Sequence, residues 1–319
     1  MPNTRRALVV GIDDYPTSPL SGCINDAKAL SGLLIANHDG SPNFDVKLTT
    51  SDLTQTTRGS LRSAVQQLFG HDDAEIALFY FSGHGTENDL GGYLVTPDAE
   101  FYDDGVNLSD VLTFANASKA KERVIILDSC MSGAFGSLPA ITSNAANLNE
   151  GVSVLTASRS GQVSIESGGR GIFTGLVCGA LEGGAADVLG NVTAAAVYAY
   201  VEQALGPWDQ RPLFKAHLSK LVSLRTAPPS VPVEVIRQFP AWFSTASAEF
   251  QLDPSYEFKS EEPDSEHVKT FQQMQKCRDA KLIEAVDAEF MYFAAMESKS
   301  CRLTPLGQHY WRLVESGRL

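Results

Sequence analysis

The 319-residue sequence has few cysteines, little positive charge and no long apolar run. Its five cysteines are odd in number and lack the spacing of metal ligands, which argues against a disulfide framework or a zinc site. Lys and Arg total 25 against 38 Asp and Glu, and the net charge of −13 disfavours a general nucleic-acid surface. No segment has the character of a secretory signal or a membrane span, so we expect a cytoplasmic protein without a membrane segment.

Apolar and amphipathic segments alternate along the first two thirds of the chain. Continuous apolar runs predict buried strands at 6–12, 44–50, 75–81, 122–130 and 151–158. Helical spacing of apolar residues predicts helices at 25–37, 57–70, 107–117, 171–183 and 193–205. Buried strands that alternate with helices are typical of a mostly parallel sheet covered by helices on both faces. We therefore predict an α/β fold for residues 1–225.

A proline-rich stretch at 226–232 predicts a linker to a second domain, residues 233–319. This second domain is expected to contain a helical segment over 269–286, a hairpin around 288–304 and a closing helix. That order resembles a winged-helix module, and a small α+β packing domain is an equal alternative. Acidic residues outnumber basic ones after residue 230, so we favour contact with a protein over contact with DNA.

Two reactive side chains follow the ends of two predicted strands. The strand at 75–81 leads into Ser82-Gly83-His84-Gly85, and the strand at 122–130 ends with Cys130. Ligands of an open parallel sheet bind at the carboxyl ends of its strands. If the two strands are neighbours, the imidazole of His84 faces the thiol of Cys130, and this pair can form a nucleophile. Taken singly, Cys130 fits a buried core residue and His84 an ordinary turn.

Glycines beside these residues favour the same chemistry. Gly85 carries no side chain, so its backbone N–H can approach a developing oxyanion together with the N–H of Cys130. Gly133 lets the chain turn sharply after Cys130. The sequence thus predicts an oxyanion hole that is built from backbone donors.

The segments "YFSGHG" and "VIILDSCMSGA" resemble the histidine and cysteine blocks of caspase-like cysteine peptidases of clan CD, in particular metacaspases and their bacterial relatives, the orthocaspases. "RALVVGIDDYPTSPLSGCINDAKAL" extends the resemblance, which covers roughly residues 5–222. It implies a hydrolase with His84 as general base and Cys130 as nucleophile, whose chemistry requires no cofactor. It further implies a role in bacterial stress, programmed death or defence.

In metacaspases an acidic pocket receives Arg or Lys before the scissile bond, and four residues here match its walls. These are Cys23, Asp26, Ser82 and Asp128. The resemblance therefore implies a protein or peptide substrate that is cleaved after Arg or Lys. Other roles are open for each residue: Asp26 can favour a helix N-terminus, Cys23 and Asp128 can pack or pair within the fold, and Ser82 can hold its turn.

Calcium activates many metacaspases, and hard oxygen ligands are available in the acidic segment after the third strand. The candidate ligands are Asp98, Asp103, Asp104 and Asp110. A solvated acidic loop is the favoured interpretation of these four residues, because the paired acids of calcium-dependent members are replaced by "NLSD". Calcium is thus a candidate activator and no part of the chemistry.

Three rival functions have distinct tests. An inactive caspase-like adaptor would not react covalently at Cys130, and a legumain-like or CHAT-type peptidase would prefer other residues before the cut. A DNA-binding regulator would shift DNA in a salt-sensitive way. The segment 233–319 is expected to bind an activator or partner protein.

Overall fold

The computed structural model describes residues 4–88, 91–100, 103–129, 148–157, 166–167, 170–205, 212–217 and 222–319. The chain divides into two compact units, Met1–Ala186 with Asn191–Ala227, and Asp187–Gly190 with Pro228–Leu319. The expected linker, 226–232, is packed at both ends: Ala227 is buried in a core of the first unit and Val231 in the core of the second. In the described part of the chain, no helix combines the length and apolarity that crossing a membrane requires.

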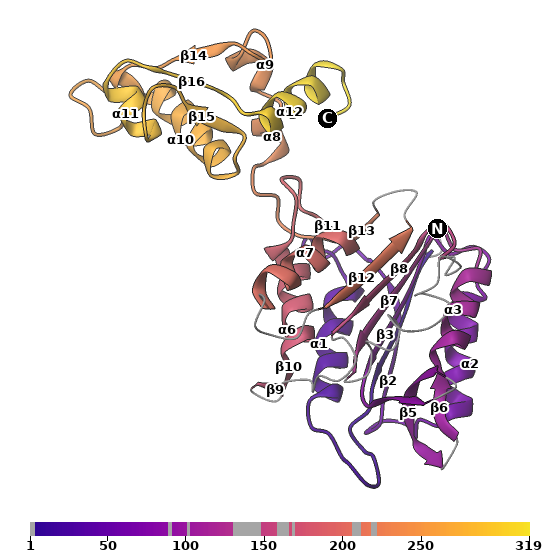
Figure 1. Ribbon diagram of the computed structural model, residues 1–319. Helices are drawn as coiled ribbons and strands as arrows, with labels where there is room; N and C mark the ends of the chain where they lie inside the picture. The colour runs from indigo at the N-terminus through magenta and orange to yellow at the C-terminus, as the bar shows by residue number, and fades with distance from the viewer. Residues whose placement is uncertain are drawn as a thin grey trace. The chain divides into compact units, whose positions relative to one another are not determined.

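The first unit is built on a six-stranded sheet with the order β12-β8-β7-β3-β1-β2 (Figure 1). Five strands are parallel neighbours, and β12 pairs antiparallel with β8. The mostly parallel sheet that the sequence predicts is confirmed, and β12 is a strand that the prediction omitted. The strands are β1 (Arg5–Gly11), β2 (Asp45–Thr50), β3 (Ile76–Ser82), β7 (Glu122–Asp128), β8 (Val152–Thr156) and β12 (Leu213–His217).

Helices cover both faces of this sheet, as Figure 1 shows. Phe79 and Phe81 of β3 pack into one core with α2 and α3, whereas Leu78 and Tyr80 pack into the opposite core with α1, α6 and α7. The alternation follows from the two-residue period of a strand, and each large apolar side chain buried in this way stabilises the fold by roughly 1.5–3 kcal/mol. The helices are α1 (Cys23–Ile35), α2 (Arg58–Phe69), α3 (Leu108–Ala117), α6 (Ile172–Gly179), the π-helix η1 (Ala180–Gly184) and α7 (Ala194–Leu205).

Smaller antiparallel elements complete the first unit. A three-stranded sheet directly follows β3 and precedes α3, with the order β4-β5-β6. Two short pairs, β9 with β10 and β11 with β13, lie later in the chain. Their bounds are β4 (Gly85–Asn88), β5 (Gly91–Glu100), β6 (Asp103–Asn107), β9 (Glu166–Ser167), β10 (Arg170–Gly171), β11 (Asn191–Thr193) and β13 (Ser223–Thr226).

The strand order reverses next to β1. The chain leaves β1 through α1 to reach β2 and returns through α2 to β3, on the other side of β1. The loops that follow β1 and β3 therefore diverge to opposite faces, and such a switch point is where open parallel sheets bind their ligands. Both His84 and the loop after Gly11 lie at this edge, so the topology itself locates the candidate site.

The second unit has a sheet of its own with the order β14-β16-β15, and both pairings are antiparallel. The hairpin expected within 288–304 is wrong: residues 291–296 form the helix α11, and β16 pairs instead with β15, which precedes that segment. Residues 283–285, expected to be helical, form β15. The winged-helix interpretation stays a prediction. The elements are α8 (Val233–Ile236), α9 (Phe239–Trp242), β14 (Glu249–Gln251), η2 (Pro254–Tyr256), α10 (Ser265–Asp279), β15 (Ile283–Ala285), α11 (Met291–Met296), β16 (Ser300–Leu303) and α12 (Pro305–Glu315).

Candidate active site

The end of β3 delivers His84 to the carboxyl edge of the sheet. Ser82 is the last residue of the strand and lies opposite Asp128, the last residue of β7. The two strands are parallel neighbours, as the sequence-based hypothesis required. Gly83 follows, and its N–H donates to the carbonyl of Asp128 at 3.3 Å. The chain thus stays hydrogen-bonded to β7 up to Gly83, the residue before His84.

The imidazole of His84 is held on two sides. Its Nε2 lies 2.7 Å from the carbonyl oxygen of Ser18, and its ring lies 4.6 Å from the ring of Tyr15, measured between centroids. A carbonyl oxygen only accepts, so this bond assigns the proton of a neutral imidazole to Nε2. Nδ1 then carries the lone pair and is the ring atom able to accept a proton.

Tyr15 is a site residue that the sequence reasoning missed. The backbone N–H of His84 donates to its hydroxyl at 3.0 Å, and that hydroxyl donates to the carbonyl of Val95 at 3.2 Å. Tyr15 is buried, and burial raises the pKa of its phenol well above the ordinary value, so it stays a neutral donor. Gly83 makes this contact feasible, since a Cβ there would lie 2.5 Å from the Tyr15 hydroxyl.

Gly85 is the residue whose N–H was expected to face an oxyanion. It lies opposite Leu94 in the β4–β5 pairing, while the N–H of Val95 donates to the carbonyl of His84. This is the pattern of a non-hydrogen-bonded antiparallel pair, in which the N–H groups of the paired residues point away from the partner strand. The N–H of Gly85 is therefore directed away from β5.

Cys130, together with Gly133, lies outside the described residues. On this side of Cys130 the last described residue is Ser129, which directly follows β7 and is buried. Ser82 and Asp128 lie opposite each other in the β3–β7 pairing. His84 comes two residues after Ser82, and Cys130 comes two residues after Asp128. The strand pairing that the Cys-His hypothesis needs is thus present.

The four residues expected to form an acidic pocket are all buried at the same edge of the first unit. Cys23 and Asp26 lie on the first turn of α1, and Ser82 and Asp128 end β3 and β7. The hydroxyl of Ser82 hydrogen-bonds the thiol of Cys23, and burial raises the pKa of that thiol well above its usual value. The thiol of Cys23 therefore stays protonated, which makes it a poor nucleophile.

Both pocket carboxylates converge on the start of α6. The N–H of Gly171 donates to Asp26 at 3.1 and 3.2 Å. A Cβ at Gly171 would lie 2.7 Å from Asp128 Oδ2 and 3.0 Å from Asp26 Oδ2, so any side chain there would collide with both acids. Gly171 thus sets the space between them. Sequence reasoning did not single it out, because its partners come from distant segments.

A chain of hydroxyls fixes the orientation of Asp128. Thr174 Oγ1 donates to Asp128 Oδ2 at 2.6 Å and lies 2.6 Å from the hydroxyl of Tyr80. Because Thr174 has a single proton, Tyr80 must donate to it. Burial, followed by the nearby charges of Asp128 and Asp26, raises the pKa of Tyr80 well above its usual value. The donor end of this chain therefore stays protonated.

An aspartate anchors the loop that carries Tyr15 and Ser18. The carboxylate of Asp13 accepts the N–H groups of Cys23 at 2.9 Å and of Ile24 at 3.2 Å, at the start of α1. N–H groups in the first turn of a helix have no acceptor within the helix, so a side-chain acceptor there stabilises the helix. The same contact ties the His84-binding loop to the helix that carries two pocket residues.

The candidate calcium ligands have separate partners. Asp98 accepts the N–H of Arg58 at the start of α2, Asp104 accepts from Asn88, and Asp110 pairs with Arg62 at 2.9 Å. The side chain of Asp103 lies outside the described residues. Among the side chains that the structure describes, no group of three or more His, Cys, Asp or Glu residues could hold a metal ion.

Comparison with known proteins agrees with this geometry. Residues 4–223 match the model of the caspase domain family, Peptidase_C14. The chain belongs to the caspase domain family. Residues 4–223 thus form a caspase domain, and the segment matched contains every candidate active-site residue named above.

The curated proteins that are similar to this caspase domain include metacaspases. Metacaspase-1 of Arabidopsis thaliana is 31% identical over 153 residues, which are 42% of this chain and 41% of the relative. Metacaspase-1A of Neurospora crassa is 32% identical over 162 residues, 46% of this chain and 36% of the relative. The chain thus spans about two fifths of the length of the curated relatives it matches.

Solved structures share the fold of the caspase domain. Caspase-1 from Spodoptera frugiperda superposes with a TM-score of 0.51 at 16% identity, over 71% of this chain and 91% of that one. A protein of Geobacter sulfurreducens gives the same TM-score at 15% identity, over 70% and 98% of the two chains. At this identity the likeness concerns the fold alone.

Proposed function

We propose that the chain is a cysteine endopeptidase in which Cys130 is the nucleophile and His84 the general base. One observation carries the proposal: the bond from His84 Nε2 to the carbonyl of Ser18 leaves Nδ1 as the ring atom that can accept a proton, and His84 follows β3, the parallel neighbour of the strand that leads to Cys130. An imidazole oriented by a third group is what activation of a thiol requires.

The steps follow from these positions. His84 Nδ1 takes the thiol proton, and the sulfur of Cys130 attacks the carbonyl carbon of the scissile bond. The resulting oxyanion accepts hydrogen bonds from the N–H groups of Gly85 and Cys130, which are typically worth about 10²–10³ each in rate. The imidazolium returns its proton to the leaving amine. Water, activated by the same Nδ1, then releases the acyl group from the sulfur.

We also propose that the enzyme cleaves after Arg or Lys. Asp26 and Asp128 are buried, converge on Gly171 and are oriented by hydrogen bonds, so they are preorganised for a cation rather than an acid. Fluorogenic peptides that differ only in the residue before the cut, Arg, Lys, Asp or Gln, test this. Faster turnover of the Asp peptide would contradict the proposal.

Selective labelling tests the nucleophile independently of any substrate choice. Cys23, Cys178, Cys277 and Cys301 are buried, and burial raises the pKa of both Cys277 and Cys301 to about 12. Thiols that are buried react slowly, so iodoacetamide at pH 7.5 should modify Cys130 alone in the native protein, as read by peptide mass spectrometry. Absence of labelling at Cys130 together with absence of peptide cleavage would favour the adaptor alternative.

Calcium dependence and the role of the second unit stay proposals. Activity measured with calcium and with a chelator tests the first, with Asp103→Asn as the informative variant. For the second, exposed aromatic side chains of Phe290, Tyr292 and Phe293 support contact with an activator or partner protein. A role in bacterial stress, programmed death or defence is proposed from the metacaspase relationship alone.

A further inference from the structure

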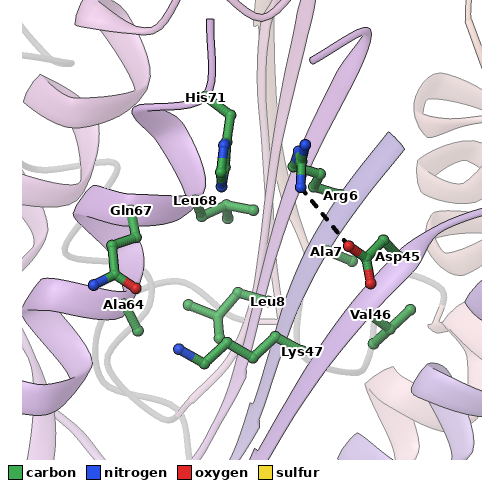
Figure 2. A pocket seen from close by; sticks show the side chains of 10 residues that line it. All are labelled: Arg6, Ala7, Leu8, Asp45, Val46, Lys47, Ala64, Gln67, Leu68 and His71. Carbon is green, nitrogen blue, oxygen red and sulfur yellow. Dashed lines mark ion pairs between the residues drawn. The ribbon is translucent and has the colours of Figure 1, made fainter. Parts of the chain in front are cut away.

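A second pocket lies at the amino-terminal ends of the strands, at the opposite end of the sheet from the candidate active site. It lies between β1, β2 and α2 and has a volume of about 200 Å³ (Figure 2). β2 is an edge strand, so the pocket opens at the side of the sheet. Nothing in the proposed peptidase mechanism uses it.

Basic and amide groups gather around this pocket, as Figure 2 shows. Arg6 and Lys47 come from β1 and β2, Gln67 from α2, and His71 from the turn after α2. Arg6 pairs with Asp45 and Leu8 with Lys47 in the β1–β2 register, so these side chains share the face toward α2. The acid Asp45 also lines the pocket and pairs with Arg6, so the lining combines two permanent cations with one carboxylate.

The acids near Arg6 hold it loosely. Asp45 and Asp73 lie 3.7 Å from its guanidinium nitrogens, and their side chains are 68% and 58% exposed. Exposed pairs of this length contribute little. In the part of the chain that the structure describes, Arg6 Nε is buried and has no hydrogen-bond partner. A buried donor without a partner is costly, so an acceptor that reaches Nε after a shift of the Arg6 side chain would be stabilised.

The floor of the pocket is apolar. Leu8 and Leu68 are buried, and Ala64 is partly buried and packs against the same core. A small floor residue such as Ala64 leaves room for a flat group above it. An apolar floor with a few convergent donors at the rim is the usual composition of a small-molecule site.

We propose that this pocket binds a small organic anion, with an apolar or aromatic body over Leu8, Ala64 and Leu68 and a phosphate or carboxylate held by Arg6, Lys47 and His71. The volume corresponds to about seven waters of bulk liquid. It therefore suits a single ring with one anionic group. Arg and Lys donors favour such oxyanions through charge-assisted hydrogen bonds.

Binding to the full-length protein tests the proposal. Phenyl phosphate and phenylacetate are titrated while amide shifts are followed by ¹H–¹⁵N TROSY, with benzyl alcohol, benzylamine and inorganic phosphate as comparison probes. We expect at least one of the two organic anions to bind with a Kd below about 1 mM and to shift amides at 45–47 and 67–71. The two anions together separate a phosphate from a carboxylate preference.

Matched charge reversals assign the binding to the pocket. Lys47→Glu should weaken the bound anion roughly tenfold or more, because it removes one charge-assisted bond and adds repulsion. Lys269→Glu makes the same change on α10 and should leave the affinity within about twofold. Lys47 is exposed, so the variant is expected to stay folded, which its melting temperature checks.

Three outcomes would overturn the proposal. The first is no shift of the pocket amides with either anion. The second is binding of benzyl alcohol or inorganic phosphate as tight as that of the organic anions. The third is equal loss of affinity in Lys47→Glu and Lys269→Glu. None of these outcomes depends on peptidase activity, so failure here is separate from failure of the proposed catalytic function.

Discussion

The two ends of the parallel sheet in the caspase domain use polar groups in opposite ways. At the carboxyl end Asp26, Ser82 and Asp128 are buried, and their partners come from distant segments of the chain. At the amino end Arg6 and Lys47 lie near the surface, and the ion pairs of Arg6 are long. Burial of the acids at the carboxyl end holds them in place but costs desolvation energy. The exposed ion pairs at the amino end contribute little free energy, so Arg6 can exchange one acidic partner for another. This contrast agrees with the two proposals, a site for chemistry at the carboxyl end and a site for reversible binding at the amino end.

Removal of the thiol is the most severe way to test the carboxyl end. Cys130→Ala should lower kcat/KM on an Arg peptide by roughly 10³-fold or more, because no other group replaces the nucleophile. Cys178→Ala removes a buried thiol from α6 and serves as the control. Retention of most activity in Cys130→Ala would refute the catalytic assignment.

Neutralising one pocket acid should come next in size. Asp128→Asn keeps the shape of the side chain and removes its charge, so kcat/KM on Arg peptides should fall roughly 30-fold or more, as expected for loss of a buried charge partner. The ratio of Arg to Gln peptide turnover is the measurement. Asp72→Asn, which removes the charge of an exposed carboxylate paired with Lys119, is the matched control, and an equal fall in both variants would argue against the pocket.

Loss of one hydroxyl should have an intermediate effect. Tyr15→Phe leaves the N–H of His84 without its acceptor and the carbonyl of Val95 without its donor, at a cost of about 1–3 kcal/mol. We expect kcat to fall about tenfold with little change in KM, since the hydroxyl positions His84 and does not touch substrate. Tyr198→Phe is the control, and an unchanged kcat in Tyr15→Phe would exclude a positioning role.

A charge change at the amino end should affect catalysis least. Lys47→Glu is expected to leave kcat/KM within about twofold, because it alters neither the His84 contacts nor the pocket acids. The assay is the same Arg peptide used for the other variants. A tenfold fall would show that the two ends are coupled, and the contrast between them would then need revision.

Much of the caspase domain follows from local pattern. In a continuous apolar run such as "EIALFYF", all side chains leave water only when both faces of the strand are buried. Such runs therefore identify β3 and its neighbours directly. β12 escaped prediction because "LFKAH" is short and half-exposed, and its strand state depends on pairing with β8. In the second unit, "MYFAAM" was assigned to a hairpin, and the structure makes it the helix α11.

The candidate site divides in the same way. His84, Ser82 and Asp128 were identifiable because each follows or ends a recognisable strand, and parallel strands end together. Tyr15, Gly171 and Thr174 were not, because each acts through a contact with residues far away in the sequence. Loop 187–190 joins the second unit for the same reason, through the burial of Val188.

The succession of strands and helices along the chain, the reactive residues at the strand ends and the acidic character of the chain were already determined by the sequence, since they depend on residue type and local period. Which groups lie together was decided only by the tertiary structure: the Ser18 carbonyl contacts His84, the Gly171 amide contacts Asp26, and Arg6 and Lys47 line one pocket. Such contacts depend on strand order and crossover geometry, which no local pattern encodes.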